Sequence, residues 1–591
     1  MVFHPPSWVP KLDFDIIPDN VPICDLILSE KHGRYSFAKS RNPFTCGLSG
    51  KTYTYAEVQD RVQFLARGLG QEMGWKPNEG SEWDKVVGIF SLNTIDYNSL
   101  CWSVHRLGGI VSPANAAYTA EEVAFQMQDS GAKCLFTCLP LLETAIKAAS
   151  KCGIPKNHIY LMEMPTEFTG PVSVPKGVYT LDDMMGLGQG CRELEDLKWE
   201  KGESKRRVAF LCYSSGTSGA PKGVMISHYN VMANSIQIKL MDKLSRDYWK
   251  KPGEDEYLEN CLGLLPMSHI YGLVVICHGS VYRGDTVIVL PKFDLKTTLK
   301  TIQDYRIGGL FLVPPIIVLF GKNEALLKQY DLSCVKSIFT GAAPLGEETA
   351  VDLNRQHPDW KIRQGYGLTE TSTVVCSTWV NDTWLGSSGS LLPGVEARIV
   401  TMEGVDIDGY DQRGELLLKA PSVVLGYLKN EQATAETFAE DGEGGRWMRT
   451  GDEAMIRKNP KSGHEHVWIT DRIKELIKVK GMQVAPAELE AHLLTHPAVG
   501  DCAVISIPDL DSGELPKAYI VKSTSVGLEE SDAMLKRDIA RHVEKTKSRH
   551  KWLKGGVEFV DVIPKSPSGK ILRRLLRDRD REERRRKGAK M

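Results

Sequence analysis

The sequence predicts an α/β protein: a large amino-terminal domain of mixed, mostly parallel sheets flanked by helices, followed by a small, mobile α+β domain. Two observations predict this class. Short apolar runs alternate with longer amphipathic segments from about residue 50 to residue 400, which is the pattern of parallel strands joined by helices. Near Asp471 a charged connector introduces a shorter pattern of helix and strand signals. A single connector leaves a domain free to pivot.

The apolar runs of the large domain have the length of buried strands, and several end in proline, glycine or a small polar residue. Strands end this way before a loop at the carboxyl edge of a sheet, where α/β proteins bind ligands. The runs are Lys85–Phe90, Val208–Cys212, Thr286–Leu290, Gly309–Val313 and Val335–Phe339. The charged segment Asp242–Tyr257, which contains proline and glycine, predicts a surface insertion, as do residues 440–446.

In the small domain, Pro486 stands where a helix could begin, and Leu489, Leu493 and Leu494 would form its apolar face. The elements expected next are strands at Asp501–Ile505 and Ala518–Val521, a helix near residues 530–548, and a solvated basic helix or tail at Arg573–Lys590. The expected division of the chain is a large domain at 1–470, a hinge at 471–474 and a lid domain at 475–591.

Composition narrows the class of protein. The 591 residues, 42% hydrophobic and 25% charged, are those of an ordinary soluble globular enzyme. A formal net charge of −1 provides no basic field for nucleic acid. The 13 cysteines are scattered without a CxxC pair, which favours reduced intracellular thiols over disulfides or a zinc site. The amino terminus has no secretory pattern, and no window of about 18 apolar residues predicts a transmembrane helix.

The most informative stretch is Tyr213-Ser-Ser-Gly-Thr-Ser-Gly-Ala-Pro-Lys222, directly after the run Val208–Cys212. Glycines let backbone N–H groups approach phosphate oxygens, hydroxyl groups donate further bonds, and lysine adds a charge. This combination predicts a polyphosphate-binding loop rather than a plain flexible turn, although the Walker pattern is absent. The candidate phosphate ligands are Ser214, Ser215, Gly216, Thr217, Ser218, Gly219 and Lys222.

Further motifs accompany this loop, each of them weak when taken alone. They are Gly263-Leu-Leu-Pro-Met-Ser-His269-Ile-Tyr-Gly272, Phe339-Thr-Gly-Ala-Ala-Pro-Leu-Gly346, Arg363-Gln-Gly-Tyr-Gly-Leu-Thr369-Glu370-Thr371, Arg449-Thr-Gly-Asp452 and Pro564-Lys-Ser-Pro-Ser-Gly-Lys570-Ile-Leu-Arg-Arg574. In this order, over essentially the whole chain, they resemble the adenylate-forming superfamily of acyl-CoA synthetases, acyl ligases and luciferases. The resemblance implies a carboxylic acid that attacks the α-phosphate of ATP, and an acyl group that then passes to the thiol of CoA.

The resemblance also implies roles for individual residues. Glu370 would hold Mg²⁺, Thr369 would contact the α-phosphate, and Gln483 would assist adenylation. The remaining residues implied at the adenosine are Ala342 at the base, Gln364, Gly365 and Tyr366 beside it, and Asp452 and Arg472 at the ribose. A carboxylate such as Asp452 can accept both ribose hydroxyl groups through its two oxygens.

Lys570 and His269 are the strongest catalytic candidates. Taken alone, Lys570 is a surface lysine in a basic tail, but its Pro-Lys-Ser-Pro-Ser-Gly-Lys frame matches the family's catalytic lysine. The charge of such a lysine at the α-phosphate is worth about 3 kcal/mol or more. His269 could be a satisfied core histidine. The resemblance instead places it at the substrate carboxylate, where it controls entry to the acyl pocket.

For the transfer to CoA, the family rotates the small domain about a hinge near Asp471 and Lys474. Residues implied near CoA are Lys292, Lys478, Lys480 and Gly481, which could equally be solvated surface positions.

Within the superfamily, the chain resembles 4-coumarate–CoA ligases and, more closely, fungal peroxisomal phenylacetyl-CoA ligases and related acyl-CoA ligases. The acyl pocket implied is Tyr271, Val275, Val313 and Gly341. Val275 stands where the plant enzymes often have a small polar residue, so we expect no partner for a ring hydroxyl. The expected substrate is an apolar phenylacetate-like or medium-chain acid.

The ending Ala589-Lys590-Met591 resembles peroxisomal addresses of the Ser-Lys-Leu type. We therefore expect a peroxisomal import receptor as partner and a location in the peroxisome, with the cytoplasm as the alternative. Three other functions stay open: an acyl-AMP ligase that loads a carrier protein in secondary metabolism, a luciferase-like oxygenase, and an inactive nucleotide-binding protein.

Overall fold

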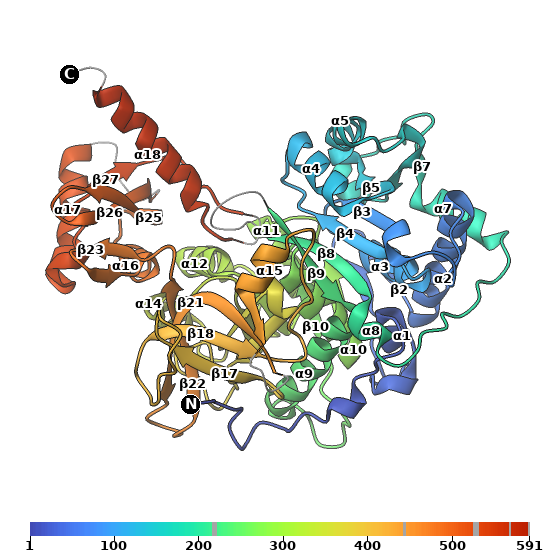
Figure 1. Cartoon of the computed structure of the whole chain (residues 1–591), viewed down its shortest axis with the longest axis horizontal. Helices are drawn as coiled ribbons and strands as arrows, with labels where there is room; N and C mark the ends of the chain where they lie inside the picture. The colour runs from blue at the N-terminus through green and yellow to red at the C-terminus, as the bar shows by residue number, and fades with distance from the viewer. Residues whose placement is uncertain (215–220, 441–444, 524–530, 567–568, 589–591) are drawn as a thin grey trace.

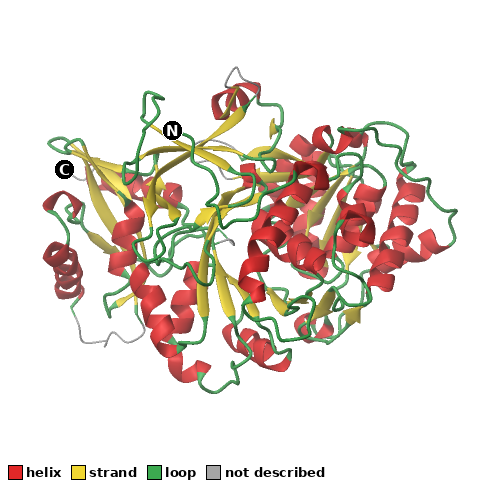
Figure 2. Cartoon of the chain, turned by 90° about the horizontal axis from the view of Figure 1, so that it is seen from below, coloured by secondary structure: helices red, strands yellow, loops and turns green. Residues whose placement is uncertain are grey.

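The structure is a computed structural model that describes residues 1–214, 221–440, 445–523, 531–566 and 569–588. It has the predicted α/β class, with mixed sheets flanked by helices and a separate carboxy-terminal lobe that carries its own sheet. Figure 1 shows this lobe beside the larger body, with α18 along its outer edge, and Figure 2 shows the helices that flank the strands.

The first sheet of the large body has nine strands in the order β16-β15-β14-β13-β12-β10-β11-β1-β2. Its interior strands, from β1 to β14, pair in parallel, so that their carboxyl ends meet at one edge of the sheet. The strands are β1 (Phe44–Cys46), β2 (Thr52–Tyr53), β10 (Asn260–Gly263), β11 (Thr286–Val289), β12 (Gly309–Leu312), β13 (Ser337–Thr340), β14 (Lys361–Leu368), β15 (Thr373–Ser377) and β16 (Ser390–Leu391).

The second sheet has eight strands in the order β19-β9-β8-β4-β3-β5-β6-β7. Its near-continuous apolar strands are buried on both faces, as expected for parallel strands under helices. The strands are β3 (Val86–Phe90), β4 (Ile110–Ala114), β5 (Cys134–Cys138), β6 (Ile159–Met162), β7 (Tyr179–Thr180), β8 (Val208–Ser214), β9 (Lys222–Ser227) and β19 (Gly426–Tyr427).

A third, antiparallel sheet completes the large body and leads toward the connector. It consists of β17 (Glu396–Val400), β18 (Gly414–Lys419), β20 (Phe438–Glu440), β21 (Arg446–Lys458) and β22 (Glu465–Arg472). Because β22 ends at Arg472 and pairs with β21 up to Asp452, the start of the connector lies beside Asp452.

The carboxy-terminal lobe has a sheet of five strands packed on helices, and the predicted face of Leu489 and Leu493 is buried in its core. Its elements are β23 (Ile477–Val479), β24 (Met482–Val484), α16 (Pro486–Leu493), β25 (Val499–Asp509), β26 (Gly513–Lys522), α17 (Asp532–Thr546), β27 (Val557–Phe559) and α18 (Arg573–Gly588). The helix expected near the carboxyl terminus is present as α18.

The remaining helices lie on the sheets of the large body. They are α1 (Ile23–Leu28), α2 (Tyr55–Met73), α3 (Tyr97–Arg106), α4 (Ala120–Ser130), α5 (Leu142–Cys152), α6 (Thr166–Thr169), α7 (Leu181–Gln189), α8 (Glu203–Arg206), α9 (His228–Asp247), α10 (Val281–Arg283), α11 (Leu295–Asp304), α12 (Pro314–Lys322), α13 (Glu324–Leu327), α14 (Glu347–Gln356), α15 (Glu431–Thr437), the π-helix η6 (Tyr271–Ser280) and the 3₁₀ turn η7 (Thr369–Thr371).

One expectation is wrong in part. Asp242–Tyr257 is not wholly a surface insertion, because α9 runs through to Asp247 and buries Ser245 and Arg246. The helix starts at a Ser227 capping box, and tertiary ion pairs hold its last turns in the interior. A run of charges does not reveal whether its partners lie elsewhere in the chain.

All thirteen cysteines are free thiols. In the part of the chain that the structure describes, no helix is both long and apolar enough to cross a membrane.

Candidate active site

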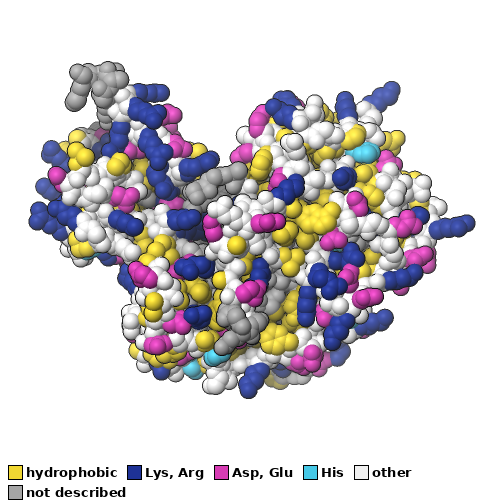
Figure 3. Space-filling model, in the orientation of Figure 1, with side chains coloured by type: hydrophobic (Ala, Val, Ile, Leu, Met, Phe, Trp, Pro, Cys, Tyr) yellow, Lys and Arg dark blue, Asp and Glu magenta, His cyan; other side chains and the backbone are white. Residues whose placement is uncertain are grey.

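A cavity of about 540 Å³ lies between the large body and the carboxy-terminal lobe. Both parts of the chain line it, and Figure 3 shows the notch that separates the two lobes at the surface. The predicted site residues that line this cavity are Ala342, Gln364, Gly365, Tyr366, Asp452, Asp471, Arg472 and Lys570. Residues distant in sequence therefore meet at the carboxyl edge of the nine-stranded sheet.

Tyr366, Asp452 and Arg472 form one polar group in this cavity. The Tyr366 hydroxyl donates to Asp452 Oδ2 at 2.6 Å, and Arg472 Nε lies 3.7 Å from Asp452 Oδ1. Burial raises the pKa of Asp452, although Arg472 and Tyr366 partly offset this effect. The Asp452 carboxylate is thus held in place, and its oxygens can still accept further hydrogen bonds. Recognition of two adjacent hydroxyl groups requires such free acceptor positions.

Lys570 enters the cavity from the loop before α18. Its backbone N–H donates to Ser566 Oγ at 3.2 Å, and the Ser566 N–H donates to Lys570 O at 2.8 Å, so two hydrogen bonds join these residues. Burial and the neighbouring Arg472 lower the pKa of Lys570 to about 8. The ammonium group forms no ion pair with the residues that the structure describes. A cavity-facing cation without a partner can bind an anionic ligand.

Glu370 lies in η7 and accepts hydrogen bonds at Oε1 from Tyr427 Oη at 3.0 Å and Ser214 Oγ at 3.4 Å. Thr369 begins the same turn. No ion pair occupies Glu370 within the described residues. A carboxylate beside a hydroxyl group is a donor set suited to a hard cation such as Mg²⁺, so these residues fit the expected metal.

The residues of the predicted phosphate loop, Ser215 to Gly219, lie outside the described part of the chain. Its two ends are described: Ser214 pairs with Lys222 across β8 and β9. Lys222 Nζ lies 4.8 Å above the ring of Tyr427, the residue that also binds Glu370. The ends of the loop therefore stand beside the candidate metal ligand.

His269 is a neutral imidazole. Burial, with a smaller contribution from the charge of Lys570, lowers the pKa of His269 to about 4. Its Nδ1 accepts from the Tyr271 backbone N–H at 3.2 Å, which leaves the ring proton on Nε2. His269 therefore offers a hydrogen-bond donor without a positive charge.

Of the predicted acyl-pocket residues, Gly341 lies next to Gly365 and Tyr271, and Val313 lies next to Gly569; Gly365 and Gly569 line the large cavity. A Cβ on Gly341 would be 3.8 Å from Tyr271 Cε1, and a Cβ on Gly569, next to Lys570, would be 3.3 Å from Val313. Tyr271 is buried, and its hydroxyl donates to Phe339 O at 2.8 Å.

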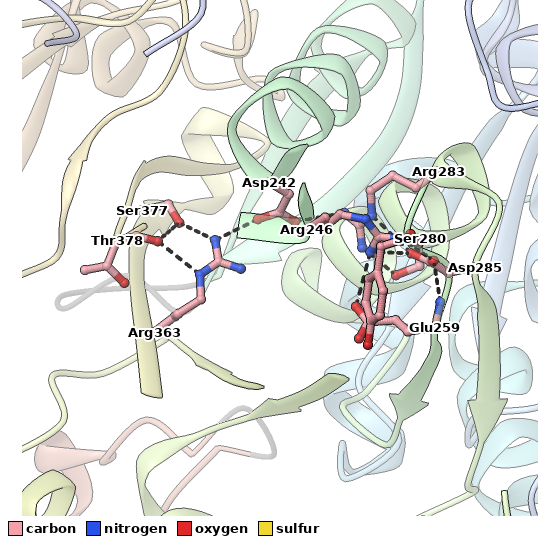
Figure 4. A network of polar contacts seen from close by, with 10 residues as sticks. Asp242, Arg246, Glu259, Ser280, Arg283, Asp285, Arg363, Ser377 and Thr378 are labelled. Carbon is pink, nitrogen blue, oxygen red and sulfur yellow. Dashed lines mark hydrogen bonds and ion pairs between the residues drawn. The ribbon is translucent and has the colours of Figure 1, made fainter. Parts of the chain in front are cut away.

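Val275 lines a second, small cavity of about 20 Å³. The same cavity is lined by Asp242 and Arg363, which belong to the network of buried ion pairs in Figure 4. The expectation that no partner for a hydroxyl stands near Val275 is therefore wrong. The partners come from α9 and β14, which are distant in sequence from Val275, so no local pattern could place them there.

The residues implied near CoA lie outside the large cavity. Lys478, Lys480, Gly481 and the adenylation candidate Gln483 are exposed together on the β23–β24 hairpin. Lys480 and Gly481 form its turn with positive φ angles of 51° and 79°. Lys292 is exposed in the large body, with its Nζ 5.2 Å above the Phe168 ring.

Two contributions to the interface between the lobes were not predicted. Lys322, at the end of α12, donates through Nζ to Val499 O at 2.8 Å and to Gly500 O at 3.2 Å. Asp471, expected only as a hinge residue, accepts from the Ala487 N–H at 3.0 Å and so caps α16. Neither contact leaves a recognisable sequence motif, because the partner atoms belong to the backbone, which every residue has.

Family models match the chain in two segments: the AMP-binding enzyme family over residues 37–428, and the AMP-binding enzyme C-terminal domain over residues 488–570. The chain is 42% identical to the acyl-CoA ligase easD of Emericella nidulans, covering 98% of this chain and 100% of that protein. It is 41% identical to the acyl-CoA ligase cm3C of Cordyceps militaris, covering 98% and 90%.

Among solved structures, the fold is similar to that of the anthranilate CoA ligase AuaEII in complex with anthranoyl-AMP. The TM-score is 0.78 at 21% identity, covering 96% of this chain and 98% of that one. At this identity the similarity supports the adenylate-forming fold and nothing finer.

Proposed function

The chain belongs to the AMP-binding enzyme family, and we propose that it is an ATP-dependent acyl-CoA ligase. A carboxylate oxygen of the acid would attack the α-phosphate of ATP, forming acyl-AMP and releasing pyrophosphate. The CoA thiolate would then attack the acyl carbon, forming the thioester and releasing AMP. The observation that carries the proposal is the Lys570 ammonium group, which forms no ion pair with any described residue and is held by the carboxy-terminal lobe in the same cavity as Asp452 and Tyr366.

Each residue has a role that its environment supports. Lys570 would offset negative charge at the α-phosphate and the attacking carboxylate. Asp452, fixed by Tyr366, would accept the ribose hydroxyl groups. His269 would donate from Nε2 to the acid carboxylate without placing a second cation beside Lys570. Glu370 with Thr369 would hold Mg²⁺, which supplies further neutralisation of phosphate charge when bound.

The second step would use the other arrangement of the lobes. We propose that residues 471–474 act as a hinge between a large domain at 1–470 and a lid at 475–591. Rotation would withdraw Lys570 and bring the exposed hairpin of Lys478 and Lys480 toward the path of CoA. The exposure of this hairpin in the present arrangement supports the proposal.

The substrate class we propose is a hydrophobic carboxylic acid of the phenylacetate-like or medium-chain type. The apolar side chains Tyr271, Phe311 and Phe339 beside the cavity support it. Pyrophosphate release measured over a panel of aryl and medium-chain acids, with and without CoA, tests both the reaction and the class. Release that depends on acid and thioester that depends on CoA are expected. The absence of acid-dependent release would refute the ligase, and a requirement for a carrier protein in place of CoA would select a carrier-loading ligase.

We also propose peroxisomal import through Ala589-Lys590-Met591, which lie outside the described residues. A fluorescent protein carrying residues 573–591 at its carboxyl end should collect in peroxisomes. The same fusion without the tripeptide should stay in the cytoplasm, and equal diffuse signals from both would contradict the address.

A further inference from the structure

Three neighbouring strands connect the large cavity to the small one. Side chains on a strand alternate between faces, so residues two apart share a face. On β13, Ser337 and Phe339 line the small cavity, and Gly341 follows on the same face beside Tyr271. On β14, Arg363 lines the small cavity and Gly365 the large one.

On β12, Gly309, Leu310 and Phe311 line the small cavity, and Val313, two residues beyond Phe311, follows at the acyl pocket. The strands are in register, with Phe311 opposite Phe339 and Phe339 opposite Arg363. One continuous face of the sheet therefore leads from the adenylate cavity, past a row of aromatic rings, to the small cavity. This geometry makes the small cavity the far end of the acyl pocket.

The wall between the two cavities consists of side chains. The rings of Tyr271, Phe311 and Phe339 meet edge to face, with centroids 6.1 to 6.4 Å apart. Rotations of these side chains would let an acyl chain pass, and rotamer changes of this kind accompany ligand binding in many proteins.

The floor of the small cavity is polar and charged. Arg363 Nη2 donates to Asp242 Oδ1 at 2.7 Å, and Arg283 Nη1 donates to Asp242 Oδ2 at 3.1 Å. Arg246 in turn donates to Asp285 at 2.7 Å and to Glu259 at 3.2 Å. Figure 4 shows these groups as one chain of contacts that runs from Thr378 to Glu259.

Such a network is poorly explained by stability alone. Replacing buried ion pairs by apolar side chains of similar volume is often neutral or stabilising, so their presence beside an apolar pocket indicates another use. Three arginines face three carboxyl groups, and burial raises the pKa of Glu259 to about 7. The network therefore offers both donors and acceptors and carries little net charge at neutral pH.

Arg363 retains donor capacity toward the cavity. Its Nε donates to Thr378 O at 3.0 Å and its Nη2 to Asp242 and Ser377. No hydrogen bond from Nη1 is found within the described residues, although the residue is only 5% exposed. Because Arg363 lines the small cavity, this guanidinium nitrogen can donate to an acceptor atom placed there.

We propose that the small cavity is the terminal subsite of the acyl pocket and takes a hydroxyl group at the far end of the acid substrate. The hydroxyl oxygen accepts from Arg363, and its proton is donated to the carboxylate of Asp242. This inference rests on the proposed ligase function and defines its substrate more narrowly.

The chemistry of the floor selects a hydroxyl over other end groups. A cavity of about 20 Å³ has room for a group the size of one water molecule. A methyl group would offer no acceptor to Arg363 Nη1. A second carboxylate would face the carboxyl groups of Asp242 and Glu259. A hydroxyl group both accepts and donates, so it matches an adjacent guanidinium and carboxylate.

The experiment compares matched acids with the wild-type enzyme. Hexanoic, octanoic and decanoic acids would be paired with their ω-hydroxy counterparts, and phenylacetic and 3-phenylpropanoic acids with their ring-hydroxylated counterparts. In at least one pair, kcat/KM for acid-dependent pyrophosphate release should favour the hydroxylated acid by about 10-fold to 100-fold. Equal or better use of the unsubstituted acid in every pair would overturn the inference and leave the ligase intact. No release with any acid would instead refute the ligase.

Two substitutions test whether the small cavity causes the preference for the hydroxylated acid. Val275→Leu adds a methylene group into the cavity and removes no member of the ion network, so it should reduce the preference for the hydroxylated acid to about 3-fold or less. Arg363→Met should do the same by removing the donor, with thermal unfolding as the check on folding. Arg355→Met is the matched control, because Arg355 is 76% exposed and, among the described residues, forms an ion pair only with Asp352. A preference unchanged in folded Val275→Leu and Arg363→Met would place the hydroxyl elsewhere and overturn the inference.

Discussion

At the scale of single residues, burial sets the protonation state of the two groups nearest the proposed reaction. His269 loses its charge, with its pKa lowered to about 4, whereas Lys570 has its pKa lowered to about 8 and keeps its charge at neutral pH. Desolvation is the largest cause in both. The site therefore has one cation, Lys570, and one neutral hydrogen-bond donor, His269, at neutral pH.

The first prediction concerns pH. Lys570 is charged below its pKa, so kcat/KM for acid-dependent pyrophosphate release should fall as pH rises through about 8. An unperturbed lysine would keep its charge until about pH 10.4. In Lys570→Arg the decline should disappear from this range, because guanidinium stays protonated. A decline near pH 8 that persists in Lys570→Arg would assign it to another group.

At the scale of elements, an irregular pair of strands shapes the turn that carries Glu370. The pairing of β14 with β15 shifts between Tyr366 and Gly367, and Thr373 has a φ of 126°, which is rare for a β-branched residue. A Cβ on Gly367 would lie 1.5 Å from Thr373 O. The close approach of the two backbones thus requires glycine and fixes the start of η7.

The second prediction follows from this contact. Gly367→Ala should destabilise the protein by about 3 kcal/mol and reduce pyrophosphate release, because the strands must separate beneath Glu370. Thermal and denaturant unfolding measure the first effect. Gly186→Ala in α7 is the control: nothing lies within 4 Å of its Cβ, so it should stabilise the helix by about 0.5 to 1 kcal/mol. Similar stabilities for the two variants would contradict the argument.

The third prediction concerns α12 and β25. Lys322 links them through two backbone carbonyl groups of the carboxy-terminal lobe. Hydrogen bonds from a charged group contribute about 1.5 to 3 kcal/mol. Lys322→Met should therefore reduce the population of the lobe arrangement in which Lys570 lies in the large cavity, and slow pyrophosphate release by about 10-fold. Transfer from supplied acyl-AMP to CoA should change little.

Lys328→Met is the control, because Lys328 is 69% exposed and pairs only with Glu324 one turn away. Equal losses in both half-reactions of Lys322→Met would indicate general destabilisation rather than a shift between arrangements.

At the scale of the whole molecule, the carboxy-terminal lobe contributes Lys570 to the large cavity, and the large body contributes Tyr366 and Asp452. The fourth prediction separates the two steps on this basis. Lys570→Ala should slow adenylation by about 10²-fold, as expected for loss of about 3 kcal/mol of charge stabilisation. Thioester formation from supplied acyl-AMP should be largely spared, because Lys570 would then have rotated away. Lys545→Ala, an exposed lysine of α17 in the same lobe, should affect neither step, and equal loss in both steps of Lys570→Ala would argue against rotation.

The sequence alone determined the fold class, the family and the residues grouped at the large cavity. Strand ends and glycine-rich turns are local features. They depend on consecutive residues, such as Arg363–Thr371, and can therefore be recognised in the sequence. The face of Leu489 and Leu493 could be predicted for the same reason, since helix periodicity alone places both in the core.

Only the tertiary structure decided which side chains share the small cavity with Val275 and which contacts join the lobes. Asp242 appeared to belong to a charged surface segment, yet ion pairs with Arg363 and Arg283 place it against Val275. Lys322 binds backbone carbonyl groups, which every residue has. The partners of a buried charge are chosen by packing between elements far apart in the chain, so no pattern of neighbouring residues can identify them.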